Sequence, residues 1–173
     1  MWEHEIIEYK NFLKLERSLS DNSVSAYVND INKLTSFLKL NHKETIEYSN
    51  INSNIIQEFV EYLYNLGISS YSQARIISGI KSFFNYLIIE EKIKINPTEL
   101  IESPKLDKKL PDTLNIDDIE NILKSIDLNS FEGVRNRAII ETLYSCGLRV
   151  SELINISYQN LFLDIGFIKV IGK

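Results

Sequence analysis

The three prolines of this 173-residue chain all lie in one short stretch, and they divide the chain into two parts. Pro97, Pro104 and Pro111 fall between Asn96 and Asp112. Proline has no backbone N–H and disfavours helix at the residue before it, so three prolines this close together interrupt regular structure. The sequence therefore predicts an amino-terminal domain over residues 1–95, an extended linker over residues 96–112 and a second domain over residues 113–173.

Four stretches of the first part carry apolar residues at helical spacing. In the second of them, Val24, Ile31, Leu34 and Leu38 fall on one face. Asn and Ser stand where the stretches begin, and Gly67 follows the third, which is typical of helix ends. Four amphipathic helices joined by short polar turns predict a compact bundle. The expected helices run from Glu5 to Glu16, from the Ser20–Ser23 cluster to about Asn41, from Asn52–Ser53 to Gly67, and from Ser69–Ser70 to about Glu91.

The second part is predicted to be helical with the first strand of a small sheet. Asn115 or Thr113 is expected to cap a helix over Ile116–Ile126, and Phe131–Cys146 is expected to form the next helix. A further helical pattern begins at Ser151, and Gly166–Ile171 shows alternation typical of a strand. The predicted fold class is therefore mainly α: a four-helix domain followed by the start of a mixed α+β domain.

The composition is that of an ordinary globular protein, with 44% hydrophobic and 25% charged residues. The single cysteine, Cys146, excludes an intrachain disulfide framework. Apolar runs stay well below the roughly 18 residues of a membrane span, and the amino terminus lacks the features of a signal peptide. A cytoplasmic protein without a membrane partner is therefore expected. His4 and His42 have no second ligand at metal spacing, so we expect no metal site.

The net charge of −5 argues against nucleic-acid binding when it is taken as a total. Phosphate neutralisation depends on the local placement of Lys and Arg, so DNA binding requires a concentrated basic face with the acidic residues elsewhere. A purely protein-binding helical bundle is the alternative that the acidic balance favours.

The segment Cys146–Leu153 is the strongest candidate for chemistry. Arg149 follows Gly147 closely and precedes the helical pattern that begins at Ser151. An arginine at such a junction lies near free backbone N–H groups, and its guanidinium can bind two phosphate oxygens. The same position suits an arginine that caps the preceding helix or pairs with Glu152. Spacing alone leaves both interpretations open.

The residues Gly147-Leu148-Arg149-Val150-Ser151-Glu152-Leu153 resemble the first catalytic-arginine motif of the tyrosine recombinases, in particular of their Xer branch. Ser103-Pro104-Lys105-Leu106 and Leu110-Pro111 resemble the interdomain linker of that family, and Val170-Ile171-Gly172-Lys173 resembles the start of its β-hairpin. The resemblance covers essentially the whole chain in three ordered motifs. It implies a four-helix, SAM-like core-binding domain followed by the start of a tyrosine-recombinase catalytic domain.

The resemblance also implies the chemistry. In that family a tyrosine attacks a phosphodiester directly, which makes a 3′-phosphotyrosyl bond and frees a 5′-hydroxyl without a cofactor or metal. Arg149 would stabilise charge on the non-bridging oxygens, and Lys173 would be the general acid for the leaving 5′-oxygen. Glu152 is either a group that holds the guanidinium in place or an ordinary surface acid. The alternative for Lys173 is a solvated lysine.

Double-stranded DNA is the partner that the resemblance implies for the second and fourth helices and the linker. On the fourth helix the small residues Ser78, Gly79 and Ser82 are expected to let the backbone approach DNA, with Arg75 and Lys81 reaching phosphates or bases. Solvated helix faces and a solvated linker are the alternative. The expected contacts are Asn22, Ser23, Arg75, Ser78, Lys81, Lys105, Lys108 and Lys109.

In the family the His-x-x-Arg motif, a further His or Trp and the nucleophilic Tyr come later than Lys173. We therefore expect an amino-terminal portion that is inactive by itself. The full-length enzyme is expected to perform site-specific recombination, most like chromosome dimer resolution. Its expected partners are a second recombinase subunit in a tetramer and a DNA translocase. The alternatives are a phage or mobile-element integrase and a non-catalytic DNA-binding helical module.

Overall fold

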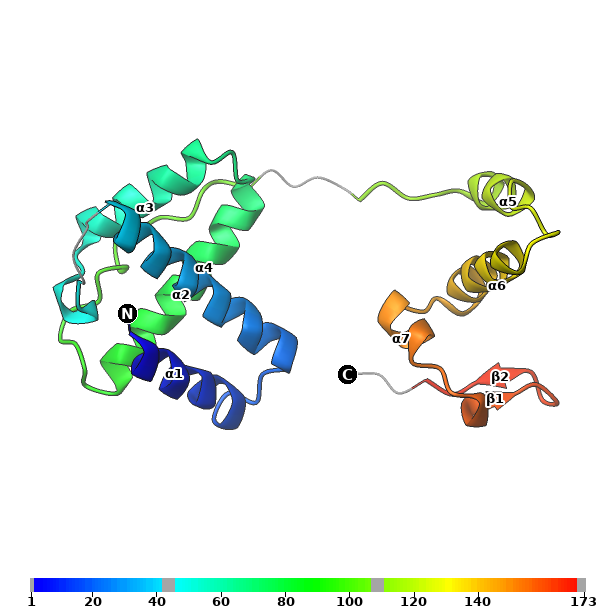
Figure 1. Cartoon of the computed structure of the whole chain (residues 1–173), viewed down its shortest axis with the longest axis horizontal. Coiled ribbons are helices and arrows are strands. Elements are labelled where there is room, and N and C mark those ends of the chain that lie inside the picture. Colours follow the sequence, from blue (N-terminus) through cyan, green and yellow to red (C-terminus); the bar gives the residue numbers. More distant parts are fainter. Residues whose placement is uncertain (1, 42–45, 107–110, 171–173) are drawn as a thin grey trace. The chain divides into compact units, whose positions relative to one another are not determined.

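The computed structural model in Figure 1 describes residues 2–41, 46–106 and 111–170. The chain forms two compact units, Met1–Lys108 and Lys109–Lys173. The division between them falls inside the stretch that contains the three prolines. Each unit has its own arrangement of helices, and within the described ranges only the second contains strands.

The described residues of the first unit form four α-helices and one short 3-10 helix (Figure 1). Local signals fix several of the helix ends. The Asn52 side chain accepts a hydrogen bond from the backbone N–H of Ile55, at 3.1 Å, and Ser69 caps the last helix in the same way. Gly67, with φ of 72°, follows the third helix. The elements are α1 (Glu3–Leu15), α2 (Asp21–Asn41), η1 (Tyr48–Asn50), α3 (Ser53–Asn65) and α4 (Ser70–Ile89).

The core of the first unit lies around α4, which packs against α2 and α3, while α1 packs against α2. Tyr9, Phe83 and Phe84 are fully buried, and the Tyr9 hydroxyl donates to Ser82 Oγ at 2.8 Å. Trp2 closes one end of this core, because its indole packs near Phe83 and its Nε1–H donates to the carbonyl of Ile46 at 2.9 Å. The helical bundle predicted from periodicity is thus present, with helix limits within a few residues of those expected.

The segment that follows α4 also belongs to this core. Thr98 and Ile101 are buried, and Ile101 joins the apolar cluster that includes Ile56 and Phe59. The Asn96 side chain accepts hydrogen bonds from the backbone N–H and the hydroxyl of Thr98. Residues at the start of the proline-containing stretch therefore lie on the first unit.

In the second unit, capping residues again set the starts of the helices. Asn115 caps α5 (Ile116–Lys124) in a capping box with Asp118, and Ser130 caps α6 (Phe131–Cys146). A five-residue helix, α7 (Val150–Ile154), and η2 (Tyr158–Asn160) follow. The strands β1 (Leu161–Phe162) and β2 (Phe167–Ile168) pair antiparallel, with Leu161 opposite Ile168. The sequence predicted β2 but not its partner, because a two-residue strand is too short to show alternation.

The second unit buries little apolar surface. Among its described residues only Gly133 is fully buried, and Phe131 is 94% and Tyr158 86% exposed. This contrasts with the first unit, where the apolar faces of the helices meet in one cluster. Within the described ranges, every helix is too short or too polar to span a lipid bilayer.

Candidate functional site

Arg149 lies at the junction between α6 and α7. Gly147 ends α6 in the left-handed conformation, with φ of 61°, and Arg149 adopts an extended conformation at the N-cap of α7. This sharp change of direction leaves the Arg149 side chain 82% exposed. The guanidinium is therefore accessible to a ligand from solvent.

Glu152 contacts both the backbone and the side chain of Arg149. Its Oε2 accepts the backbone N–H of Arg149 at 2.8 Å, and its Oε1 accepts a hydrogen bond from Nη1 at 2.9 Å. These two contacts, the backbone one being the stronger influence, keep the pKa of the Glu152 carboxyl below its usual value. The arginine–glutamate pair foreseen as one alternative is thus present. The other alternative, in which Arg149 binds a phosphate, calls for an ionised carboxylate that orients an exposed guanidinium. The contacts of Glu152 with Arg149 are compatible with that arrangement as well.

Several predicted residues cannot be placed in this site. Lys108, Lys109 and Lys173 lie outside the described residues. Lys105 is described and is exposed, after the part of the chain that packs on the first unit. Across the described ranges no three His, Cys, Asp or Glu residues gather closely enough to hold a metal ion.

The predicted face of α4 is partly as expected. Arg75 and Ser78 are exposed and Lys81 is half-buried. In the first turn of α2, Asn22 is exposed and Ser23 is half-buried. The expectation that small residues open this face to DNA is wrong for Gly79. Gly79 is buried against α2, where a Cβ atom would lie 2.4 Å from Asp30 Oδ2. Ser82 is half-buried and accepts the Tyr9 hydrogen bond.

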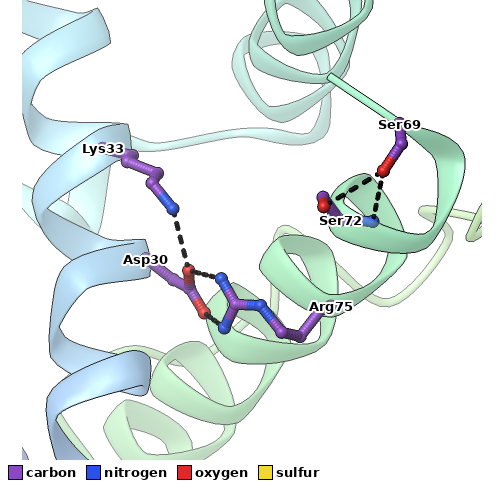
Figure 2. Close-up of polar contacts among 5 residues, drawn as sticks. All are labelled: Asp30, Lys33, Ser69, Ser72 and Arg75. Carbon is purple, nitrogen blue, oxygen red and sulfur yellow. Dashed lines mark hydrogen bonds and ion pairs between the residues drawn. The ribbon is translucent and has the colours of Figure 1, made fainter. Parts of the chain in front are cut away.

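An ion pair between a buried carboxylate and an exposed arginine joins α2 to α4 (Figure 2). Asp30 is fully buried, and its two carboxylate oxygens accept hydrogen bonds from Arg75 Nη1 and Nη2 at 2.8 and 2.6 Å. Lys33, one turn further along α2, places its Nζ 3.5 Å from Asp30 Oδ1. Asp30 was not predicted as a site residue, although it stands beside Ile31 on the apolar face of α2, where an unpaired carboxylate is costly. Its position on an apolar face was the signal in the sequence that could have identified Asp30.

Figure 2 also shows Ser69 and Ser72 at the start of α4, one turn before Arg75. The Ser69 hydroxyl accepts the backbone N–H of Ser72 at 3.4 Å and lies 3.1 Å from the Ser72 hydroxyl. Ser72, Arg75 and Ser78 are three residues apart and all exposed, so they follow one face of α4. The first unit therefore presents a polar face with two cations, Arg75 and Lys33, over a buried carboxylate.

The chain belongs to the phage integrase family of tyrosine recombinases. A model of the SAM-like amino-terminal domain of phage integrases matches residues 6–91, and a model of the phage integrase family matches residues 112–173. Among individual relatives, it is 42% identical over 168 residues to tyrosine recombinase XerD of Staphylococcus aureus and 41% identical to that of Staphylococcus epidermidis. The match covers 97% of this chain and 56% of each relative, so the chain spans little more than half their length.

Two solved structures show the same fold. A lambda integrase dimer bound to a COC′ core site matches 91% of this chain and 42% of its own, with a TM-score of 0.68 at 17% identity. The integrase of mycobacterium phage Brujita matches 100% of this chain and 56% of its own, with a TM-score of 0.54 at 19% identity. Identities this low establish fold only.

Proposed function

We propose that this chain is part of a site-specific DNA recombinase of the XerD kind. The observation that carries the proposal is the 42% identity to XerD along 97% of the chain. The exposed Arg149, held by Glu152 at the junction of α6 and α7, supports it from the structure. Because the chain spans 56% of these relatives, the activity is proposed for a polypeptide of their full length.

In the proposed reaction a tyrosine oxygen attacks a DNA phosphorus and the bond to the 5′-oxygen breaks. Arg149 donates to the non-bridging oxygens and stabilises the charge that they gather in the transition state. Glu152 keeps the guanidinium in place through the contact at Nη1. Lys173 gives its proton to the leaving 5′-oxygen. The nucleophilic tyrosine is proposed to lie outside this sequence, so residues 1–173 alone are expected to be inactive.

For binding, we propose that the polar faces of α2 and α4 contact double-stranded DNA, through Asn22, Ser23, Arg75, Ser78 and Lys81. Lys105, Lys108 and Lys109 would add contacts to the backbone from the linker. The solved lambda integrase dimer is bound to a DNA core site, which supports both DNA binding and assembly on DNA in this family. A tetramer with a second recombinase subunit, chromosome dimer resolution in the cytoplasm, and activation by a DNA translocase complete the proposal.

A suicide DNA substrate, whose cleaved strand diffuses away, tests the catalytic part on the full-length protein. Wild type is expected to accumulate a covalent protein–DNA adduct. Arg149→Ala should lower its rate of formation by roughly 10²–10³-fold, since it removes one preorganised donor to the transition state. Arg135→Ala is the matched control, because Arg135 is exposed on α6 and, among the described residues, donates only to its neighbour Asn136. Wild-type rates in Arg149→Ala would contradict the proposal.

A further inference from the structure

We propose that Asp30 is a positioning residue that orients Arg75 toward a phosphate of the DNA backbone. The inference rests on the DNA-binding part of the proposed function and specifies how one contact of that surface is made. It assigns a function to Asp30, a buried carboxylate that was not among the site residues predicted from the sequence.

The space around Asp30 is shaped for a carboxylate that faces Arg75. The side chain is only 1% exposed, and it reaches α4 at Gly79, where a Cβ atom would overlap Oδ2. Both of its oxygens accept hydrogen bonds from the two terminal nitrogens of Arg75. A bidentate pair of this kind fixes the plane of the guanidinium as well as its distance.

The way in which Asp30 binds Arg75 leaves part of the guanidinium available. Arginine has five N–H donors, and Asp30 takes one from each terminal nitrogen. The remaining three, including that on Nε, have no hydrogen-bond partner within the described part of the chain. The Nε edge of a guanidinium can donate two parallel hydrogen bonds to a phosphate, and the Arg75 side chain is 50% exposed.

Lys33 completes the arrangement from α2. Its Nζ is 3.5 Å from Asp30 Oδ1, and its side chain is 46% exposed. Two cations thus surround one carboxylate, which gives the cluster a net charge of +1 (+2 − 1). Figure 2 shows the carboxylate between the two cations, and it is 1% exposed while their side chains are 46% and 50% exposed, so a ligand that approaches from solvent meets positive charge first. A single anionic group such as a phosphate diester suits this arrangement.

The binding of the 173-residue chain to a labelled DNA duplex, measured by anisotropy over a range of salt concentrations, tests the inference. Asp30→Asn removes a negative charge, so electrostatics alone would tighten binding to DNA. Loss of positioning predicts the opposite, a roughly tenfold weaker affinity. Asp21→Asn is the matched control, since it makes the same change at an exposed site on the same helix and should leave binding unchanged or tighter.

A double-variant cycle shows whether Asp30 acts through Arg75. Arg75→Gln should weaken binding and lower the slope of log affinity against log salt by about one. Adding Asp30→Asn to Arg75→Gln should then cause no further loss. Arg75→Lys keeps the charge but not the bidentate geometry, and it too should weaken binding several-fold. Circular dichroism at the assay temperature confirms that each variant is folded.

The outcomes separate this inference from the proposed function. If the wild-type chain shows no salt-dependent DNA binding, the DNA-binding proposal fails and the inference fails with it. If wild type binds but folded Asp30→Asn binds as well or more tightly, Asp30 is only a structural ion-pair partner and the inference alone is overturned. Should Asp30→Asn not fold, Arg75→Lys decides, because wild-type affinity in that variant overturns the inference.

Discussion

At the scale of single residues, Glu152 shows how one carboxylate can serve a backbone and a side chain together. It accepts the N–H that begins α7 and a guanidinium N–H from the same arginine. Both contacts favour the ionised form, so the pKa of Glu152 in the folded protein lies below that in the unfolded chain. The pair therefore contributes stability above the unfolded pKa and loses it as the pH falls through the folded pKa.

An NMR titration of the Glu152 carboxyl is expected to give a midpoint below the usual value of about 4.3. Arg149→Ala removes the guanidinium contact and keeps the backbone N–H, so the midpoint should rise only part of the way back to that value. The backbone contact is the largest of the influences that lower this pKa, so part of the shift should survive. A wild-type midpoint at the usual value would contradict the ion pair.

In the full-length enzyme, Glu152→Gln is expected to slow adduct formation by roughly tenfold, since residues that hold a functional group in place commonly have effects of this size. The loss should be smaller than that in Arg149→Ala, because the guanidinium remains. Glu120→Gln is the control, as Glu120 pairs with Lys124 on the exposed side of α5. Equal rates in wild type and Glu152→Gln would show that Glu152 is only a surface acid.

Sequence reasoning reached Arg149 and Glu152 because their partnership is local. They are three positions apart in the sequence, and a helix start brings such neighbours together. Asp30 and Arg75 are 45 residues apart, and only the packing of α2 on α4 joins them. A carboxylate on the apolar face of a predicted helix signals that a partner exists, but it does not name that partner.

At the scale of elements, Gly79 allows α4 to lie close to α2. The prediction that Gly79 opens α4 to DNA was wrong because a small residue looks the same in sequence at a helix–helix contact and at a ligand surface. The structure shows that the absent side chain makes room for Asp30. The residue thus serves the polar connection between two helices.

Gly79→Ala is expected to lower the free energy of unfolding by about 1–3 kcal/mol, since the added methyl overlaps a fixed carboxylate. The direction is informative, because Gly→Ala inside a helix usually stabilises by up to about 1 kcal/mol. Ser78→Ala, one residue earlier on the exposed face, should change stability by less than about 0.5 kcal/mol. Urea unfolding of the three proteins measures both effects, and a more stable Gly79→Ala would contradict the packing described.

The positions at which the helices begin were the feature best predicted from the sequence. Four helices begin at a residue whose side chain accepts the backbone N–H three positions later: Asn52, Ser69, Asn115 and Ser130. Such caps can be recognised from the local sequence without knowledge of the tertiary structure. The strand β1 was missed, because its two residues acquire their conformation by pairing with β2. Local signals in the sequence thus predict the helices, but they do not predict which short segments pair as strands.

At the scale of the whole molecule, the two units differ in how well their apolar residues are covered. The first unit has one large cluster of buried apolar residues. In the second, helix residues such as Ile116 and Ile154 stay 64% and 73% exposed. Burial of apolar surface is the main favourable contribution to folding, so the two units are expected to differ in stability.

Residues 1–106, expressed alone, are expected to unfold in one cooperative transition on heating. Residues 111–173, expressed alone, should show no such transition and should bind a hydrophobic dye, because their described part has almost no buried core. Circular dichroism and dye fluorescence of the two fragments test this difference. A sigmoidal melting curve for residues 111–173 would show that the exposed apolar residues find partners within this segment.

The prolines predict a linker over residues 96–112, and two residues of that stretch, Thr98 and Ile101, are buried on the first unit. Ile101 and Thr98 lie among linker residues, and nothing local distinguishes a buried isoleucine there from a solvated one. Contact with Ile56 and Phe59 makes the difference, and that depends on the shape of the assembled bundle.

Trp2, the only tryptophan in the sequence, is 7% exposed beside Phe83 and Phe84. Its indole is thus an intrinsic fluorophore that belongs entirely to the first unit. Its emission shifts to longer wavelength when the indole enters water, which reports opening of this bundle without any added label, while events confined to residues 111–173 leave the local environment of the indole unchanged.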